Sequence, residues 1–125
     1  MIESLKNKSN SIALVGASKN PDKYGNKILK DLISKGYRVF PINKSEKEID
    51  GLEVFKNVTD LNEIPSIINF VVPPNESRTV TNYLVSKGYD NFWYQPGAES
   101  QYISSYLKSL NKIFIDDNCI MVETK

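Results

Sequence analysis

The chain contains no histidine, and this absence removes several kinds of active site. Its 125 residues include 0 His. Histidine is the commonest general base near neutral pH and the commonest neutral ligand of metal ions. Ser-His-Asp and Cys-His mechanisms are therefore excluded, and a zinc site would need one cysteine and several carboxylates. We accordingly assign no catalytic residue and no metal ligand.

Cysteine, net charge and long apolar runs are also scarce. Cys119 is the only cysteine, so an intrachain disulfide is impossible and a reducing compartment fits best. The net charge of +1 gives no strong field to attract nucleic acid or acidic lipid. No apolar run approaches the ~20 residues that cross a bilayer, and "MIESLKNKSNS" at the N-terminus lacks a signal-peptide core. We expect a cytoplasmic protein that binds neither nucleic acid nor membrane.

What the chain does contain is an alternation of strand-like and helix-like segments within the length of one domain, residues 1–125. Apolar runs predict strands at residues 11–16, 37–42, 66–72, 91–95 and 113–115, and a last short strand or tail at 119–123. Helical spacing predicts helices from Gly25 to Gly36, from residue 75 or 76 to Gly88, and at 100–110. The side chains expected to face the core are Ile28, Leu29, Leu32 and Ile33 on the first helix and Val80, Tyr83 and Leu84 on the second.

Two intervening segments are less regular. Residues 51–58 are expected to form a loop with a short strand, and residues 60–65 a helical turn that ends before Pro65. The overall order of strands and helices predicts an α/β fold, a parallel sheet with helices on both faces. Such sheets bind ligands beyond the carboxyl ends of their strands. Residues that directly follow the strands are therefore the candidate site.

Gly16, Ala17 and Ser18 follow the first strand and precede a helix. Gly16 permits a tight turn, Ser18 offers a hydroxyl, and a helix N-terminus offers unpaired N–H groups that suit a phosphate. The spacing is not the dinucleotide pattern G-x-G-x-x-G, because the next glycine is Gly25. Two interpretations stay open: a phosphate site, or a simple turn with solvated lysines nearby.

Pro41, Asn43 and Lys44 follow the second strand, where nucleotide-binding α/β folds meet the ribose. An acid at this point suits the free 2′-hydroxyl of NAD, whereas a basic residue suits a phosphorylated ribose. Lys44 therefore favours a ligand with a phosphate on its ribose. The alternative is a polar surface loop with a solvated lysine.

Val72, Pro73 and Pro74 end the third strand. Two prolines remove two backbone donors and stop the strand, and they also form a rigid apolar wall that suits a flat ligand group. A strand terminator without a ligand explains the pair equally well.

Residues 95–100, "QPGAES", follow the fourth strand. Gly97 permits close backbone approach, and Glu99 or Ser100 can cap the next helix. Glu99 is also the best candidate for an acid near a cleft, although capping alone is the favoured interpretation. Gln95 belongs to the same candidate wall.

Together these motifs resemble a known family. "VGASKNPDKYGNKILKDLISKGYRVFPINK", "VVPP", "WYQPGAES" and "CIMVE" look like the small stand-alone CoA-binding domain proteins, over almost the whole chain. These are similar to the CoA-binding domain of the succinyl-CoA synthetase alpha chain. The resemblance implies a doubly wound, Rossmann-like fold with a mainly parallel, five- or six-stranded sheet.

The resemblance also implies a ligand, coenzyme A or an acyl-CoA, held by its nucleotide part. By family pattern, phosphate would meet Gly16, Ala17, Ser18 and Lys23; the ribose and its 3′-phosphate would meet Pro41, Asn43 and Lys44; adenine or pantetheine would lie beside Val72, Pro73 and Pro74; and the far wall would be Gln95, Pro96, Gly97 and Glu99. Synthetase activity is not implied, because the synthetases use a phosphorylated histidine in a separate domain.

Three functions remain for comparison with the structure. The first is a binding or sensing module for CoA that catalyses nothing. The second is a small enzyme acting on a CoA thioester, with Glu99 as the base. The third is an NAD(P)-binding or protein-interaction domain. The residues identify a small nucleotide ligand but no protein partner.

Overall fold

Five short parallel strands form the centre of the computed structural model, which describes residues 1–124. The elements are η1 (Ile2–Lys6), β1 (Ser11–Val15), α1 (Tyr24–Ser34), β2 (Arg38–Ile42), β3 (Glu48–Ile49), β4 (Leu52–Glu53), η2 (Val58–Asp60), β5 (Ile67–Phe70), α2 (Pro74–Ser86), β6 (Phe92–Tyr94), α3 (Gln101–Ser109), β7 (Phe114–Ile115) and α4 (Ile120–Glu123). The single domain predicted for 1–125 extends to Lys125, which lies outside the described residues.

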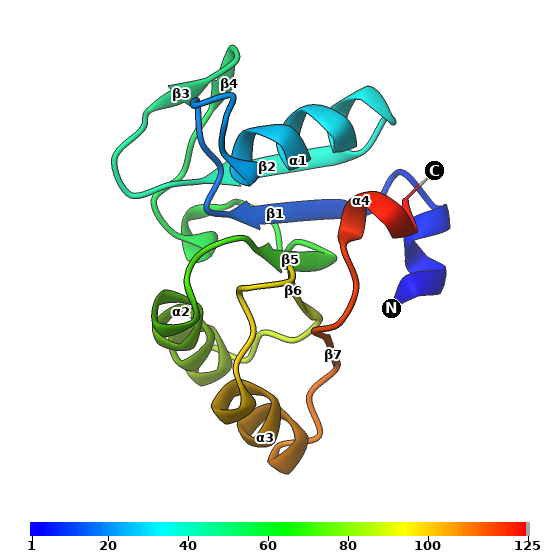
Figure 1. Ribbon diagram of the computed structural model, residues 1–125, viewed down its shortest axis with the longest axis vertical. Helices are drawn as coiled ribbons and strands as arrows, with labels where there is room; N and C mark the ends of the chain where they lie inside the picture. Colours follow the sequence, from blue (N-terminus) through cyan, green and yellow to red (C-terminus); the bar gives the residue numbers. More distant parts are fainter. Residues whose placement is uncertain (125) are drawn as a thin grey trace.

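The sheet has the strand order β2-β1-β5-β6-β7, and every neighbouring pair is parallel (Figure 1). β1 lies inside the sheet, with Ala13 opposite Phe40 of β2 and Ile68 of β5. The chain leaves β1 toward one edge through α1 and later proceeds toward the other edge from β5. This is the doubly wound, Rossmann-like order, in which a crevice opens where the direction reverses.

Helices cover both faces of the sheet, as predicted. β1 is buried along its whole length, and its alternate residues face opposite sides. Ile12 and Leu14 pack in one core, which includes Leu29 of α1 and Ile120 of α4. Ala13 and Val15 point to the opposite face of the sheet. They belong to a second core with residues of α2 and α3, among them Leu84, Ile103 and Leu107. Figure 1 shows α1 beside β1 and β2, and α2 and α3 beside the later strands.

Residues 119–123 were predicted to form a last short strand or a tail, and this prediction is wrong: Ile120–Glu123 form the short helix α4, with Cys119 as its N-cap. Ile120 is fully buried against α1, and the Nζ of Lys35 donates to the Met121 carbonyl at 2.9 Å. A three-residue apolar run does not distinguish a strand from a buried helical turn. Here the docking partners decide, since the sheet already ends at β7 and has five strands.

Two side chains expected in the core are exposed. Ile33 lies at the margin of the apolar stripe of α1 and is 41% exposed. Tyr83 is 45% exposed, while Leu84 beside it is buried. The predicted turn at residues 60–65 is displaced to η2, which starts at Val58. No helix within residues 1–124 is long and apolar enough to span a bilayer.

Candidate functional site

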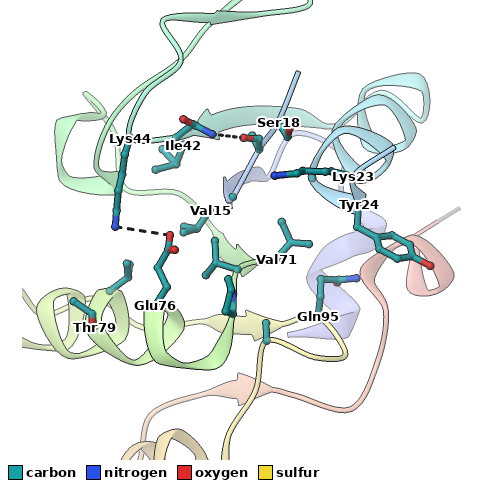
Figure 2. Close-up of a pocket in the computed structure, with 18 of the residues that line it drawn as sticks. Val15, Ser18, Lys23, Tyr24, Ile42, Lys44, Val71, Glu76, Thr79 and Gln95 are labelled. Carbon is teal, nitrogen blue, oxygen red and sulfur yellow. Dashed lines mark hydrogen bonds and ion pairs between the residues drawn. The ribbon is translucent and has the colours of Figure 1, made fainter. Parts of the chain in front are cut away.

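A cleft of about 1260 Å³ opens at the carboxyl ends of β1, β2, β5 and β6. Val15 and Ile42 line it from the ends of β1 and β2, and Val71 and Gln95 from the positions directly after β5 and β6 (Figure 2). The four strand ends meet here because all strands of the sheet are parallel. The cleft therefore lies where the strand order predicts a ligand site.

The loop between β1 and α1 is packed so tightly that it requires two glycines. Gly16 has a φ of +103°, and a Cβ on it would lie 2.7 Å from Cγ1 of Val72. A Cβ on Gly25 would lie only 2.0 Å from the carbonyl oxygen of Gly16. Gly25 thus lets the first turn of α1 touch the end of β1. The contact brings the start of α1 to the cleft.

Two backbone amides of this loop are already used in hydrogen bonds to β2. The N–H groups of Gly16 and Ala17 both donate to the Ile42 carbonyl, at 3.1 and 3.2 Å. Ser18 keeps a usable group: its hydroxyl accepts from the Asn20 amide at 3.0 Å and still has a hydrogen to donate. The groups of this loop best suited to an anion are therefore the Ser18 hydroxyl and the start of the helix.

The N-terminus of α1 faces the cleft without a side-chain cap. Lys23 is the N-cap residue, and its side chain forms no capping hydrogen bond. The first N–H groups of a helix have no intrahelical partner and lie at the positive end of its dipole. Figure 2 shows the Lys23 side chain pointing into the cleft and Tyr24 pointing away from it. Lys23 can thus add a full charge to the partial charge of the helix end.

The loop after β2 has one structural residue, Asn43, and one largely exposed cation, Lys44. The Asn43 side chain donates to the Ala17 carbonyl at 2.8 Å and accepts from the amides of Ser45 and Glu46. Asn43 therefore ties the two loops together. Lys44 lines the cleft with a side chain that is 75% exposed, and its Nζ lies 4.0 Å from the Glu76 carboxylate.

The β5–α2 turn supplies an apolar wall. Val72, Pro73 and Pro74 all line the cleft, and Pro74 opens α2, where a missing N–H costs nothing. The Ser77 amide donates to the Pro73 carbonyl at 2.9 Å and stabilises the turn. The turn therefore combines a start of a helix with a rigid nonpolar surface.

The far wall is largely structural. Gln95 is 4% exposed, accepts from the Ile120 amide at 2.9 Å and donates to Sγ of Cys119 at 3.1 Å. The Glu99 carboxylate accepts from the Gly97 amide at 2.8 Å, and Ser100 is the cap of α3. Glu99 thus holds its own turn in place.

The structure brings together nearly all of the predicted site residues. Each of them lines the cleft except Pro41 and Glu99. Pro41 is inside β2, paired with Leu14, and its carbonyl accepts from the Phe55 amide. Ile42 takes the lining position because strand side chains alternate between the faces. Whether any of these residues binds a ligand stays a prediction.

Several lining residues were missed. Lys56, Asn57 and Val58 reach the cleft from the segment after β4, and no local pattern connects them to β1. One face of α2 also lines it, through Glu76, Thr79, Val80, Tyr83 and Leu84. Their spacing of three and four residues is that of one helix face, and this signal was available in the sequence.

Residues 10–125 match the sequence profile of a family described as "CoA binding domain". This match spans nearly the whole chain. The chain belongs to the CoA-binding domain family. The resemblance drawn from the sequence motifs is therefore confirmed, and membership associates this CoA-binding domain with coenzyme A.

Individual relatives show the same relationship. A conserved hypothetical protein from Pyrococcus furiosus has a solved structure with a TM-score of 0.88 and 48% identity, covering 92% of this chain and 99% of that one. The uncharacterized Bacillus subtilis protein YneT is 25% identical over 97% of this chain and 90% of its own length. The alpha subunit of the ADP-forming acetate–CoA ligase II of P. furiosus is 32% identical over 62% of this chain but only 16% of its own length. The similarity to the ligase thus concerns a small part of that subunit.

Proposed function

We propose that this CoA-binding domain binds coenzyme A or an acyl-CoA through the nucleotide part and catalyses no reaction of its own. The observation that carries the proposal is the cleft at the point where the strand order changes direction, between β1 and β5. This cleft combines lysines with a helix start that has no side-chain cap. The charged residues that line it are Asp22, Lys23, Lys44, Lys56 and Glu76. Cations outnumber acids there, which suits a ligand with several phosphate groups.

The two ends of the cleft suit different parts of the nucleotide. Ser18, Lys23 and the first turn of α1 suit the pyrophosphate, because a hydroxyl, an ammonium and unpaired N–H groups converge there. Lys44 follows β2, at the position that meets the ribose in doubly wound folds. A cation at this position favours the 3′-phosphate of CoA over the free ribose of NAD.

The surface between these charged groups is apolar and suits the adenine ring. Val58 and Val72 belong to the core that lines the floor of the cleft, and Val80 of α2 packs against the same core. The two prolines at the start of α2 add rigid surface that loses no side-chain entropy on binding. A flat base would bury apolar area here without displacing a hydrogen-bonded group.

The positions of the carboxylates support the proposal that this domain catalyses no reaction. Glu99, the base that an enzyme would need, is bonded to Gly97 and does not line the cleft. Within residues 1–124 the lining carboxylates are Asp22 and Glu76, and Glu76 pairs with Lys44. The thioester enzyme therefore has less support than the binding module.

Calorimetric titration with CoA, NAD and ADP tests the proposal. We expect CoA to bind with a dissociation constant on the order of micromolar, and NAD and ADP to bind more weakly. Lys44→Glu should weaken CoA binding by about tenfold or more, because attraction becomes repulsion. Lys30→Glu is the matched control, since Lys30 is exposed on α1 and does not line the cleft. Absence of binding at millimolar CoA would refute the proposal.

A further inference from the structure

One ion pair crosses the cleft from wall to wall. Lys44 comes from the loop after β2 and Glu76 from the first turn of α2, and their Nζ and Oε2 atoms lie 4.0 Å apart. Figure 2 shows the two side chains pointing toward each other across the cleft, joined by a dashed line. Both residues line the cleft. A ligand group that reaches Lys44 must therefore also meet Glu76.

The surroundings of the pair distinguish it from the other charges. Among the lysines that line the cleft, Lys44 is the one whose Nζ pairs with a carboxylate within residues 1–124. The Lys19–Glu46 pair, at 3.4 Å, involves two residues that do not line the cleft. The start of α2 stabilises the Glu76 carboxylate through the positive end of the helix dipole. Glu76 is thus a negative charge held beside the cation that a phosphate would use.

We propose that Glu76 competes with the ribose phosphate of the ligand for Lys44, and so determines how strongly the cleft prefers a phosphorylated over an unphosphorylated ribose. This inference rests on the proposed function. A ligand without that phosphate leaves the Lys44–Glu76 pair intact. A ligand with it takes Lys44 from Glu76 and places two negative groups side by side.

The pair is weak enough to be exchanged during binding. The side chains of Lys44 and Glu76 are 75% and 35% exposed, and an ion pair of this exposure contributes little to stability. A phosphomonoester carries nearly two charges and outcompetes one carboxylate for an ammonium. Glu76 therefore lowers the affinity for the phosphorylated ligand without blocking it.

Titrations of CoA and dephospho-CoA against the wild type, Glu76→Gln and Glu46→Gln test the inference. Glu76→Gln should tighten CoA binding about 3- to 10-fold and change dephospho-CoA binding by less than about twofold. Glu46→Gln removes the same charge outside the cleft and should change neither. In a Lys44→Gln background the gain from Glu76→Gln should shrink, because the cation that both groups share is gone.

Two other results would overturn the proposed competition between Glu76 and the ribose phosphate. Equal tightening for both ligands would mean a general charge effect, and unchanged or weaker CoA binding would mean that Glu76 does not compete. If the wild type binds CoA, either result removes this inference alone. If neither the wild type nor any variant binds CoA, the proposed function fails and the inference fails with it. Thermal unfolding of each variant checks that the fold is retained.

Discussion

Gly16 and Gly25 act on the site for different reasons. Gly16 has a positive φ, which side chains with a Cβ rarely adopt. Gly25 has no such angle and is required for space, because the Gly16 carbonyl oxygen occupies the position of its Cβ. The sequence indicated the turn at Gly16, but it showed Gly25 only as the start of a helix. Only the folded backbone shows that these two residues touch.

Gly25→Ala should destabilise the protein by about 3 kcal/mol or more, at or above the upper end of the usual cost of overpacking. The added Cβ would lie 2.0 Å from the Gly16 oxygen, a backbone atom that cannot rotate away. The start of α1 would have to move, so CoA binding should weaken as well. Urea unfolding measures the loss, with Lys30→Ala on the exposed side of α1 as control. A free energy of unfolding within about 0.5 kcal/mol of the wild type would contradict the close contact.

At the scale of elements, α4 is too short to be a stable helix alone. Its four residues are held by side chains from elsewhere: Gln95 accepts from the Ile120 amide, and Lys35 donates to Met121 and Thr124. An isolated helix of this length is far below the ~12 residues that are marginal in water. The prediction of a short strand or tail failed because a short apolar run does not indicate which distant side chains will bind its backbone.

Gln95→Ala should loosen α4 more than it alters the sheet. The Ile120 amide loses its acceptor and Cys119 its donor, so we expect a loss of about 1–3 kcal/mol in the free energy of unfolding. Hydrogen exchange of the α4 amides should become faster, while that of β1 follows the global stability. Gln101→Ala, at the exposed start of α3, is the control. Unchanged exchange in α4 would show that Gln95 does not hold the helix.

At the scale of the whole molecule, the charge is distributed unevenly although its sum is small. The net charge is +1, yet the cleft gathers Lys23, Lys44 and Lys56 beside two acids. Tyr94 adds no charge to this balance, because burial of its hydroxyl beside Thr81 raises its pKa far above the usual value. Attraction of an anionic ligand should therefore come from the cleft rather than from a general field.

Binding of CoA should consequently stabilise the fold in a salt-dependent way. At a CoA concentration about 100 times its dissociation constant, the free energy of unfolding should rise by about 2.7 kcal/mol. The gain should fall as NaCl is raised, because salt screens exposed charges such as Lys44. Thermal unfolding with and without CoA measures this, with pantetheine, which lacks phosphates, as control. A stabilisation that is independent of NaCl would contradict an electrostatic site.

The order of strands and helices and the location of the cleft could be predicted because their signals are local. β1 is apolar from Ile12 to Val15, Gly36 ends the turn after α1 with a φ of +93°, and Pro73 and Pro74 end the run that contains β5. Each is a property of a few consecutive residues. In a parallel sheet, the residues that follow the strands then meet at one edge without further information.

The tertiary structure alone decided which groups lie opposite one another. Lys56 lines the cleft although its segment is distant from β1 in the chain. The Asn43 side chain donates a hydrogen bond to the Ala17 carbonyl, and Glu76 forms an ion pair with Lys44 across the cleft. The two residues of each pair, Asn43–Ala17 and Glu76–Lys44, are far apart in the chain, and their contact depends on strand order, crossovers and loop packing. The sequence by itself determined the five strands of the sheet, the helices α1, α2 and α3, and the edge at which a ligand would bind. Packing between distant segments decided which side chains are free to bind it, because an exposed lysine and a paired one look identical in a sequence.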